Sequence, residues 1–326
     1  MSDAFSRSAG ALAAHFRRQR PMRAGSLLIT LFGDAVAPRG GAISLGSLIE
    51  LAEPFGISEL LVRTALRRLV NEHWLESRRV GRRSEYRLSR SGLELFADAT
   101  QQIYGSTVRA WSGTWTIVTL GRRGGPARQS TKEALIWAGF GQPAPGVFAH
   151  PGSTASAARK LLHRSGDRGD ALVLETKDSP ATAHRELADR GWDLADLAKR
   201  YRRFIARFEP INQCLARCVN PSPLACFIVR TLLIHEYRKI HLRDPLLPAA
   251  LLPVGWVGAD AYAVCRRLYG RVGLPAEQYL DAHGATLASP LPEAGADLYA
   301  RFRGILAAGS KPGVRNRDHK AARIVP

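Results

Sequence analysis

The sequence lacks the features that mark secreted, membrane-spanning and disulfide-rich proteins. It has four cysteines in 326 residues and no run of eighteen apolar residues, and its first residues are polar and arginine-rich. Neither a membrane span nor a secretory signal peptide is therefore expected. Free thiols in a reducing cytoplasm are the simplest interpretation. Cys214 and Cys218 are four residues apart and could share a metal, but zinc sites favour tighter C-x2-C pairs, so buried thiols are the preferred interpretation.

Motifs of common enzyme classes are also missing. The glycine-rich stretch GFGQPAPG lacks the lysine of a phosphate-binding loop, and GSTAS lacks the second glycine of a nucleophile elbow. In HEYRKIH, His235 and His241 are six residues apart, whereas the zinc-protease motif needs a spacing of four. We predict no catalytic residue, no metal site and no cofactor, and we do not expect an enzyme.

Acidic residues are scarce relative to basic ones. The chain has 28 Asp and Glu against 47 Lys and Arg, which gives a formal net charge of +19. Such an excess favours a polyanionic partner, because each neutralised phosphate releases condensed counterions. An arginine preference of a GC-rich genome would produce the same total. The placement of the charge has to decide between the two explanations.

Changes in composition divide the chain into blocks. We expect a flexible leader over residues 1–20, a first domain over 21–105, a middle domain over 106–180, a helical domain over 181–308 and a disordered basic tail over 309–326. In the middle block, runs such as TWTIVTL, RQSTKEALIWAGF, GVFAHP, TASAARKLLHRSG and DALVLETK alternate between strand and helix patterns. This rhythm predicts a ferredoxin-like, split βαβ sheet with one edge strand that the pattern does not place.

The first block predicts three helices and a hairpin. The first helix ends near Gly33, the second begins after Ser44 and ends at Pro54–Gly56, and the third is capped by Ser58 and continues to Asn71. Two extended runs, WLESRRV and SEYRLS, follow and are joined by GRR, where Gly81 can adopt a positive φ. Three helices followed by a basic hairpin are typical of a winged helix-turn-helix. The fold class is therefore α+β multidomain, with a winged helix-turn-helix, a ferredoxin-like middle domain and a mostly helical C-terminal domain.

Positive charge gathers on the third helix and the hairpin. At 100° per residue, the apolar side chains of the third helix fall on one side and its polar side chains on the other. Residues 59–90 contain nine arginines against four glutamates, nine minus four, a local charge of +5. A cationic helix face is often only solvated, but its combination with this hairpin favours double-stranded DNA as the partner. The candidate DNA-binding residues are Ser58, Arg63, Thr64, Arg67, Arg68, Asn71, Arg78, Arg79, Arg82 and Arg83.

These residues lie within a longer stretch that resembles the repressors of phenylacetic acid catabolism, the PaaX family. The resemblance begins at RAGSLLITLFGDAV and continues through ISLGSLIELAEPFGISELLVRTALRRLVNEHWLESRRVGRRSEYRLSRSG, WSGTWTIVTL, GFGQPAPGVFAHP and LIHEYRKIHLRDPLLPAALLPVGWVG. It therefore spans Arg23 to about Gly258. It implies a cytoplasmic, nucleoid-associated repressor of aromatic catabolic genes that binds operator DNA as a homodimer. It further implies release by an aryl-CoA thioester such as phenylacetyl-CoA.

The helical block holds the candidate effector residues. A CoA thioester offers phosphates, a purine and an acyl group, for which arginines, aromatic rings and an apolar slot are complementary. Core or capping roles are an alternative for Tyr201 and His235, and a solvated face for Arg202. The candidates are Tyr201, Arg202, His235, Arg238, Arg243 and Trp256.

Two other functions remain as alternatives. One is a metal-dependent nuclease that uses the ferredoxin-like domain, but its first strand ends in VTLGRR without the aspartate that such a site needs. The other is a nucleic-acid-binding protein without sequence preference, which would rely on the basic helices and tail.

Overall fold

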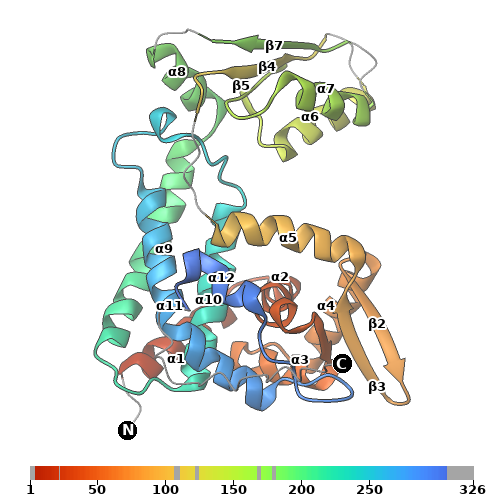
Figure 1. Ribbon diagram of the computed structural model, residues 1–326, viewed down its shortest axis with the longest axis vertical. Coiled ribbons are helices and arrows are strands. Elements are labelled where there is room, and N and C mark those ends of the chain that lie inside the picture. The colour runs from red at the N-terminus through yellow and green to blue at the C-terminus, as the bar shows by residue number, and fades with distance from the viewer. Residues whose placement is uncertain are drawn as a thin grey trace, which may run out of the picture.

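The computed structural model describes residues 4–21, 23–105, 111–121, 125–166, 170–177 and 181–306. Within these ranges the chain is α+β, with twelve α-helices and seven strands in two small antiparallel sheets (Figure 1). The predicted disordered tail over 309–326 lies outside the described residues.

The predicted helices and hairpin of the first block are confirmed. Helix α3 begins after Ser44, whose hydroxyl accepts a hydrogen bond from the Ser47 amide, and α4 begins after Ser58, which caps Leu61 in the same way. The hairpin pairs with a short strand that the sequence patterns missed, in the order β1-β3-β2. The elements are α2 (Ala24–Leu31), β1 (Ala42–Ser44), α3 (Leu45–Ala52), α4 (Glu59–Asn71), β2 (Leu75–Val80) and β3 (Arg83–Leu88).

The first predicted helix does not end at Gly33. The chain continues as a π-helical turn over Phe32–Val36 and a 3-10 turn over Ala37–Arg39. This continuation places the side chain of Asp34 inside the protein, at 3% exposure. The glycine signal was misleading because contacts of Asp34 with distant residues favour the helical backbone.

The segment predicted as a flexible leader is instead a helix. Helix α1 (Ala4–Arg17) buries an apolar stripe, and it packs against α10 (Pro223–His241) and α9 (Leu194–Ala216). Phe5 and Phe16 are only 1% and 2% exposed. The stripe, which consists of Phe5, Ala9, Leu12, Ala13 and Phe16, follows the 3.6-residue period of a helix. Polar residues separate these apolar ones along the sequence, so the helical period was not recognised.

The middle block forms a separate layer of strands and helices at one end of the molecule (Figure 1). The order of its sheet is β5-β6-β4-β7, and all neighbouring strands are antiparallel. Strand β5, at one edge, is the strand that the sequence pattern could not place. The elements are β4 (Trp115–Thr119), α6 (Pro126–Trp137), β5 (Gly141–Ala144), β6 (Val147–His150), α7 (Ala155–Arg164), β7 (Leu172–Thr176) and α8 (Ala181–Gly191).

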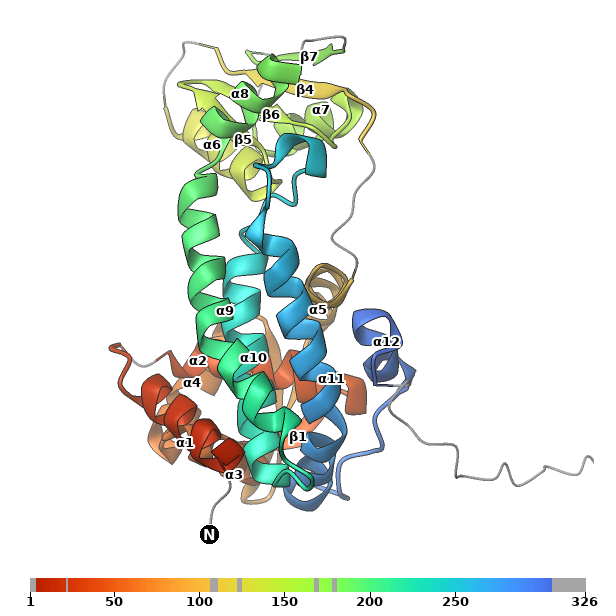
Figure 2. The ribbon, with the colours of Figure 1, turned by 90° about the vertical axis from the view of Figure 1, so that its left-hand side faces the viewer.

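Three long helices connect this layer to the first block. Helices α9, α10 and α11 (Val257–His283) run side by side, and α5 (Arg90–Tyr104) and α12 (Ala296–Gly304) lie beside them (Figure 2). One cluster of buried apolar side chains extends from Phe5 through Leu66 and Phe227 to Leu306. The first block and the C-terminal helices therefore share a hydrophobic core. The domain boundaries expected from the sequence remain predictions.

A cluster of buried charges joins these two parts of the chain. The Asp34 carboxylate accepts hydrogen bonds from Arg230 Nε at 2.7 Å, Tyr104 Oη at 2.6 Å and Arg301 Nη1 at 3.0 Å. Arg230 also pairs with Glu277, which in turn accepts a 2.8 Å hydrogen bond from Arg39 Nε. Burial opposes the ionisation of Asp34, but the guanidinium groups of Arg230 and Arg301 outweigh it and hold the pKa of Asp34 below its ordinary value.

Candidate nucleic-acid interface

Helix α4 separates its apolar and cationic side chains as the sequence predicts. Val62, Leu66 and Leu69 are buried in the core that α4 forms with α2 and α3. Because these side chains turn inward, the polar residues between them must face solvent. The predicted residues Ser58, Arg63, Thr64, Arg67, Arg68 and Asn71 are all exposed.

The exposed arginines of α4 differ in their partners. Arg63 Nε donates to Glu59 at 2.8 Å, and Arg68 Nε donates to Glu72 at 2.7 Å. Both are exposed pairs of the i,i+4 type, which hold their members weakly and can exchange for phosphates. Arg67, between them, makes no hydrogen bond or ion pair with the described residues. Its guanidinium is therefore available to a ligand without a competing carboxylate.

The hairpin β2–β3, which contains the second set of predicted residues, projects from the body of the protein (Figure 1). Its register pairs Val80 with Arg83, which leaves Gly81 and Arg82 as the turn, and Gly81 has a φ of 59°. Such a turn fits the twist of a two-residue hairpin. The predicted residues Arg78, Arg79, Arg82 and Arg83 are all exposed.

Two apolar side chains beside these arginines were missed by the sequence analysis. Leu60, in the first turn of α4, is 74% exposed, and Val80, at the tip of the hairpin, is 51% exposed. Leu60 lies three and four positions before Arg63 and Thr64, on the same face of the helix. Leu60 lies outside the apolar stripe of α4, and this position in the helical pattern could have indicated that its side chain is exposed. Exposed apolar groups in such positions can contact a thymine methyl group.

The predicted effector residues lie in two separate places. Tyr201 is buried, donates a 2.7 Å hydrogen bond to Asp244, and packs its ring edge-on against Trp256. His235 and Arg238 instead both contact Thr30 of α2, at 3.1 Å and 2.8 Å. Arg202 and Arg243 are exposed. The structure therefore does not gather the six side chains around one cavity, and their role in effector binding stays a prediction.

His235 is buried between α1, α2 and α10, with its Nδ1 3.1 Å from the Thr30 hydroxyl and its Nε2 4.0 Å from the Glu236 carboxylate. It is fully buried, the ring of Phe16 packs edge-on against it, and its Nε2 has no hydrogen-bond partner among the described residues. Burial, together with the positive charges of Arg238, Lys239 and Arg23, holds the pKa of His235 well below its ordinary value of 6.5. The native protein therefore keeps this ring neutral.

This neutral histidine predicts that the protein loses stability in mild acid. Below pH 6.5 the unfolded chain binds a proton at His235 and the native chain does not, so the free energy of unfolding falls as the pH decreases. The contribution reaches at most about 1.4 kcal/mol per pH unit. Urea unfolding at several pH values should show a steeper slope for the unaltered chain than for His235→Gln. Equal slopes would show that His235 does not titrate in this way.

The described residues offer no set of ligands for the metal site that the nuclease alternative would need. No group of three or more His, Cys, Asp and Glu side chains among them is placed to hold a metal ion. One carboxylate, Asp170, lies beside Gly121, just after the end of β4. His235 and His241 make different contacts, His241 with Tyr201 and Gln102.

None of the helices in the described ranges is both long enough and apolar enough to span a bilayer.

The fold and the exposed surface define an α+β protein, mostly helical, that presents an arginine-rich helix and hairpin as a candidate nucleic-acid interface. Residues 23–92 match the family model of PaaX-like proteins, and residues 192–282 match that of the PaaX-like C-terminal domain. The chain is 37% identical over 289 residues to the transcriptional repressor PaaX of Escherichia coli K12, across 87% of this chain and 92% of the repressor. The chain belongs to the PaaX-like family.

A solved structure, that of the uncharacterized protein Rv0674 from Mycobacterium tuberculosis, is also similar. It is 24% identical, with a TM-score of 0.46 over 70% of this chain and 89% of that chain.

Proposed function

We propose that the protein is a transcriptional repressor of aromatic, phenylacetate-type catabolic genes that binds operator DNA in the cytoplasm. Its similarity to the Escherichia coli repressor supports this role. In this proposal residues 21–105 form a winged helix-turn-helix, and the middle sheet belongs to a ferredoxin-like domain. The single observation that carries the proposal is the exposure of all the predicted DNA-binding side chains on α4 and the adjoining hairpin.

The two elements have different roles in the proposed complex. Helix α4 enters the major groove, where Arg63, Thr64 and Arg67 read base edges and Leu60 contacts thymine methyl groups. Arg68 and the hairpin arginines bind phosphates, which supplies affinity and fixes the register on the duplex. Ser58 and Asn71 lie at the two ends of α4 and contact the flanking backbone. The hairpin arginines are Arg78, Arg79, Arg82 and Arg83.

This division of roles predicts different effects for Arg67→Ala and Arg82→Ala. Loss of a bidentate contact with guanine costs about 1–3 kcal/mol of discrimination, so Arg67→Ala should relax the sequence preference. Arg82→Ala should weaken specific and random DNA alike and lower the salt dependence by about one counterion. The measurement is a selection of bound duplexes from a random pool, followed by titrations of selected and random DNA at several salt concentrations.

A matched control is Arg159→Ala, which removes an exposed arginine from α7, in the separate middle layer (Figure 1). It should leave both affinities unchanged. If Arg67→Ala and Arg82→Ala lower the affinities for specific and random DNA by one common factor, the assignment of roles is wrong. If the unaltered chain selects no preferred sequence, the protein is a general nucleic-acid binder.

The proposal includes a homodimer on a palindromic operator and release by an aryl-CoA thioester such as phenylacetyl-CoA. A ligand releases DNA only if it binds the DNA-incompetent state more tightly than the DNA-bound state. The effector therefore needs a site whose residues are connected to α4 through the core.

A further inference from the structure

Residues 17–23, which join α1 to α2, form a further group of positive charge. They include Arg17, Arg18, Arg20 and Arg23 and no acidic residue, which gives four positive charges in seven residues. All four arginines are exposed. Such a density of one charge favours a polyanionic partner. The neighbours of the segment indicate which partner that is.

The segment is held against α4 near both of its ends. The side chain of Arg17 lies directly over Gly56, because a Cβ on that glycine would be only 2.3 Å from Arg17 Cδ. Gly56 has a φ of 70° and comes two residues before Ser58, the N-cap of α4. Just after the segment, a Cβ on Gly25 would lie 3.9 Å from the Cβ of Ala65, in the middle of α4. Residues 17–23 therefore border the N-terminal half of α4.

Two of the four guanidinium groups are available to a ligand at this place. The side chains of Arg17 and Arg23 make no hydrogen bond or ion pair with the described residues. Arg20 has a structural role, since its Nη1 donates to the Arg17 and Gln19 carbonyls at 2.7 Å and 3.1 Å and thereby caps the end of α1. Arg17 and Arg23 thus flank the start of α4 without a competing carboxylate.

This position is important because a helix in the major groove lies between two rows of phosphates. An α-helix with its side chains is about 10–12 Å across, close to the width of the groove, so groups beside the helix meet the phosphates at the edge of the groove. The hairpin follows the C-terminal end of α4, whereas residues 17–23 border its N-terminal half. Figure 1 shows α1 and the hairpin on opposite sides of the first block. The two groups of arginines therefore face different stretches of the DNA backbone.

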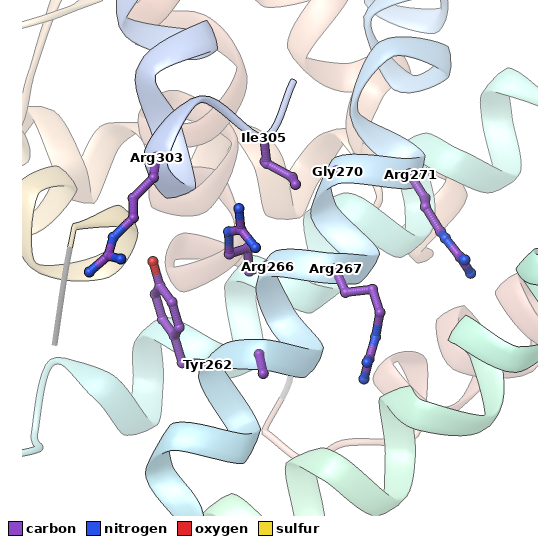
Figure 3. A pocket seen from close by; sticks show the side chains of 8 residues that line it. Tyr262, Arg266, Arg267, Gly270, Arg271, Arg303 and Ile305 are labelled. Atoms are coloured by element: carbon purple, nitrogen blue, oxygen red, sulfur yellow. The ribbon is translucent and has the colours of Figure 1, made fainter. Parts of the chain in front are cut away.

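Another group of arginines lies far from this position. A cavity of about 680 Å³ between α11 and α12 is lined by Arg266, Arg267, Arg271 and Arg303 (Figure 3). Figure 2 shows α1 and α4 on one side of the long helices and α12 on the other. A duplex that is bound by α4 lies on the side of α1, away from this cavity.

We propose that residues 17–23 form a third contact with the DNA backbone, in which Arg17 and Arg23 bind phosphates beside the N-terminal half of α4. The inference rests on the proposed function, because it needs α4 in the major groove. Hydrogen bonds from guanidinium groups to phosphates are strong and carry no sequence information. The segment therefore adds affinity and fixes the orientation of α4 without changing the sequence preference.

The test is titration of the full chain with its preferred duplex and with random duplexes at several salt concentrations. Each phosphate contact contributes about 0.9 to the slope of log affinity against log salt concentration, so Arg17→Gln/Arg23→Gln should lower that slope by about 1.8. The affinities for preferred and random DNA should fall by the same factor. Glutamine keeps the Cγ and Cδ carbons that pack on Gly56, and thermal melting checks that the fold is kept.

Two control variants separate a local contact from net charge and from a structural role. Arg18 lies about 100° away from Arg17 around the axis of α1 and beside His15, and Arg159 is exposed on α7. Arg18→Gln/Arg159→Gln removes the same charge and should leave the slope nearly unchanged. Arg17→Lys/Arg23→Lys keeps the charge and should retain most of the slope, because the slope counts neutralised phosphates.

Hydroxyl-radical footprints of the preferred duplex give the position of the contact. Arg17→Gln/Arg23→Gln should expose a stretch of backbone that remains protected in Arg82→Ala, because the segment and the hairpin lie at different ends of α4. Loss of protection at the same positions in both variants would contradict a separate contact.

The titrations distinguish failure of this inference from failure of the proposed function. Equal slopes for Arg17→Gln/Arg23→Gln and its charge-matched control would overturn the inference, while an unaltered chain that selects an operator would still support the repressor. A lysine variant as weak as the glutamine variant would reduce the segment to a structural role. An unaltered chain with no affinity for any duplex would refute the proposed function, and this inference with it.

Discussion

Arg230→Met should lower the free energy of unfolding by about 3–5 kcal/mol, because it leaves two carboxylates buried without their shared cation. Arg230 is 1% exposed and contacts both Asp34 and Glu277. Methionine fills much of the same volume, so the loss of charge rather than a cavity dominates the change. Asp34 keeps Arg301 as a partner and Glu277 keeps Arg39, but the two buried carboxylates lose the one cation that lies between them in a medium of low polarity.

Denaturant unfolding at neutral pH measures this effect. The matched control is Arg190→Met, since Arg190 makes an exposed pair with Glu186 at 2.6 Å and such pairs contribute at most about 1 kcal/mol. A loss for Arg230→Met no larger than that for Arg190→Met would mean that the cluster does not depend on this cation. The comparison separates burial from pairing, because both arginines are paired but only one is buried.

Phe16→Ala should destabilise the protein by about 3–5 kcal/mol, the usual cost of removing a buried phenyl ring. Phe16 packs edge-on against Phe55 of the first block, with ring centroids 6.3 Å apart, and against His235 of α10, at 5.5 Å. The change therefore opens a space where three parts of the chain meet. A flexible leader would give no measurable loss.

Thermal or urea unfolding of Phe16→Ala and of Arg18→Ala provides the comparison. Arg18 is exposed, two residues further along the chain, and its removal should change stability by less than about 0.5 kcal/mol. Equal and small losses in both variants would show that α1 does not support the core. A large loss only in Phe16→Ala would establish the first residues as part of the folded unit.

Local chemistry determined much of the candidate interface. The serine caps Ser44 and Ser58, the buried stripe of α4 and the glycine turn at Gly81 depend on residues within a few positions of one another. Periodicity and capping record such short-range preferences, so they predicted which side chains of α4 and the hairpin face solvent. The middle strands β4, β6 and β7 were predictable for the same reason.

Long-range packing determined the rest. The burial of α1, the short strand β1 and the edge strand β5 depend on partners far away in the sequence, and none has a strong local pattern. The effector prediction met the same limit, because Tyr201 and His235 have chemically suitable side chains, and only tertiary contacts show that both are buried.

By itself, the sequence determined that an amphipathic helix and a basic hairpin follow each other and carry an excess of arginine. Only the tertiary structure decided that the first block shares a core with the C-terminal helices, and that Arg266, Arg267, Arg271 and Arg303 surround one cavity. The physical reason is the range of the interactions. Helix periodicity, caps and turns are set by neighbours in the chain, whereas burial and the meeting of distant charges depend on how the whole chain packs.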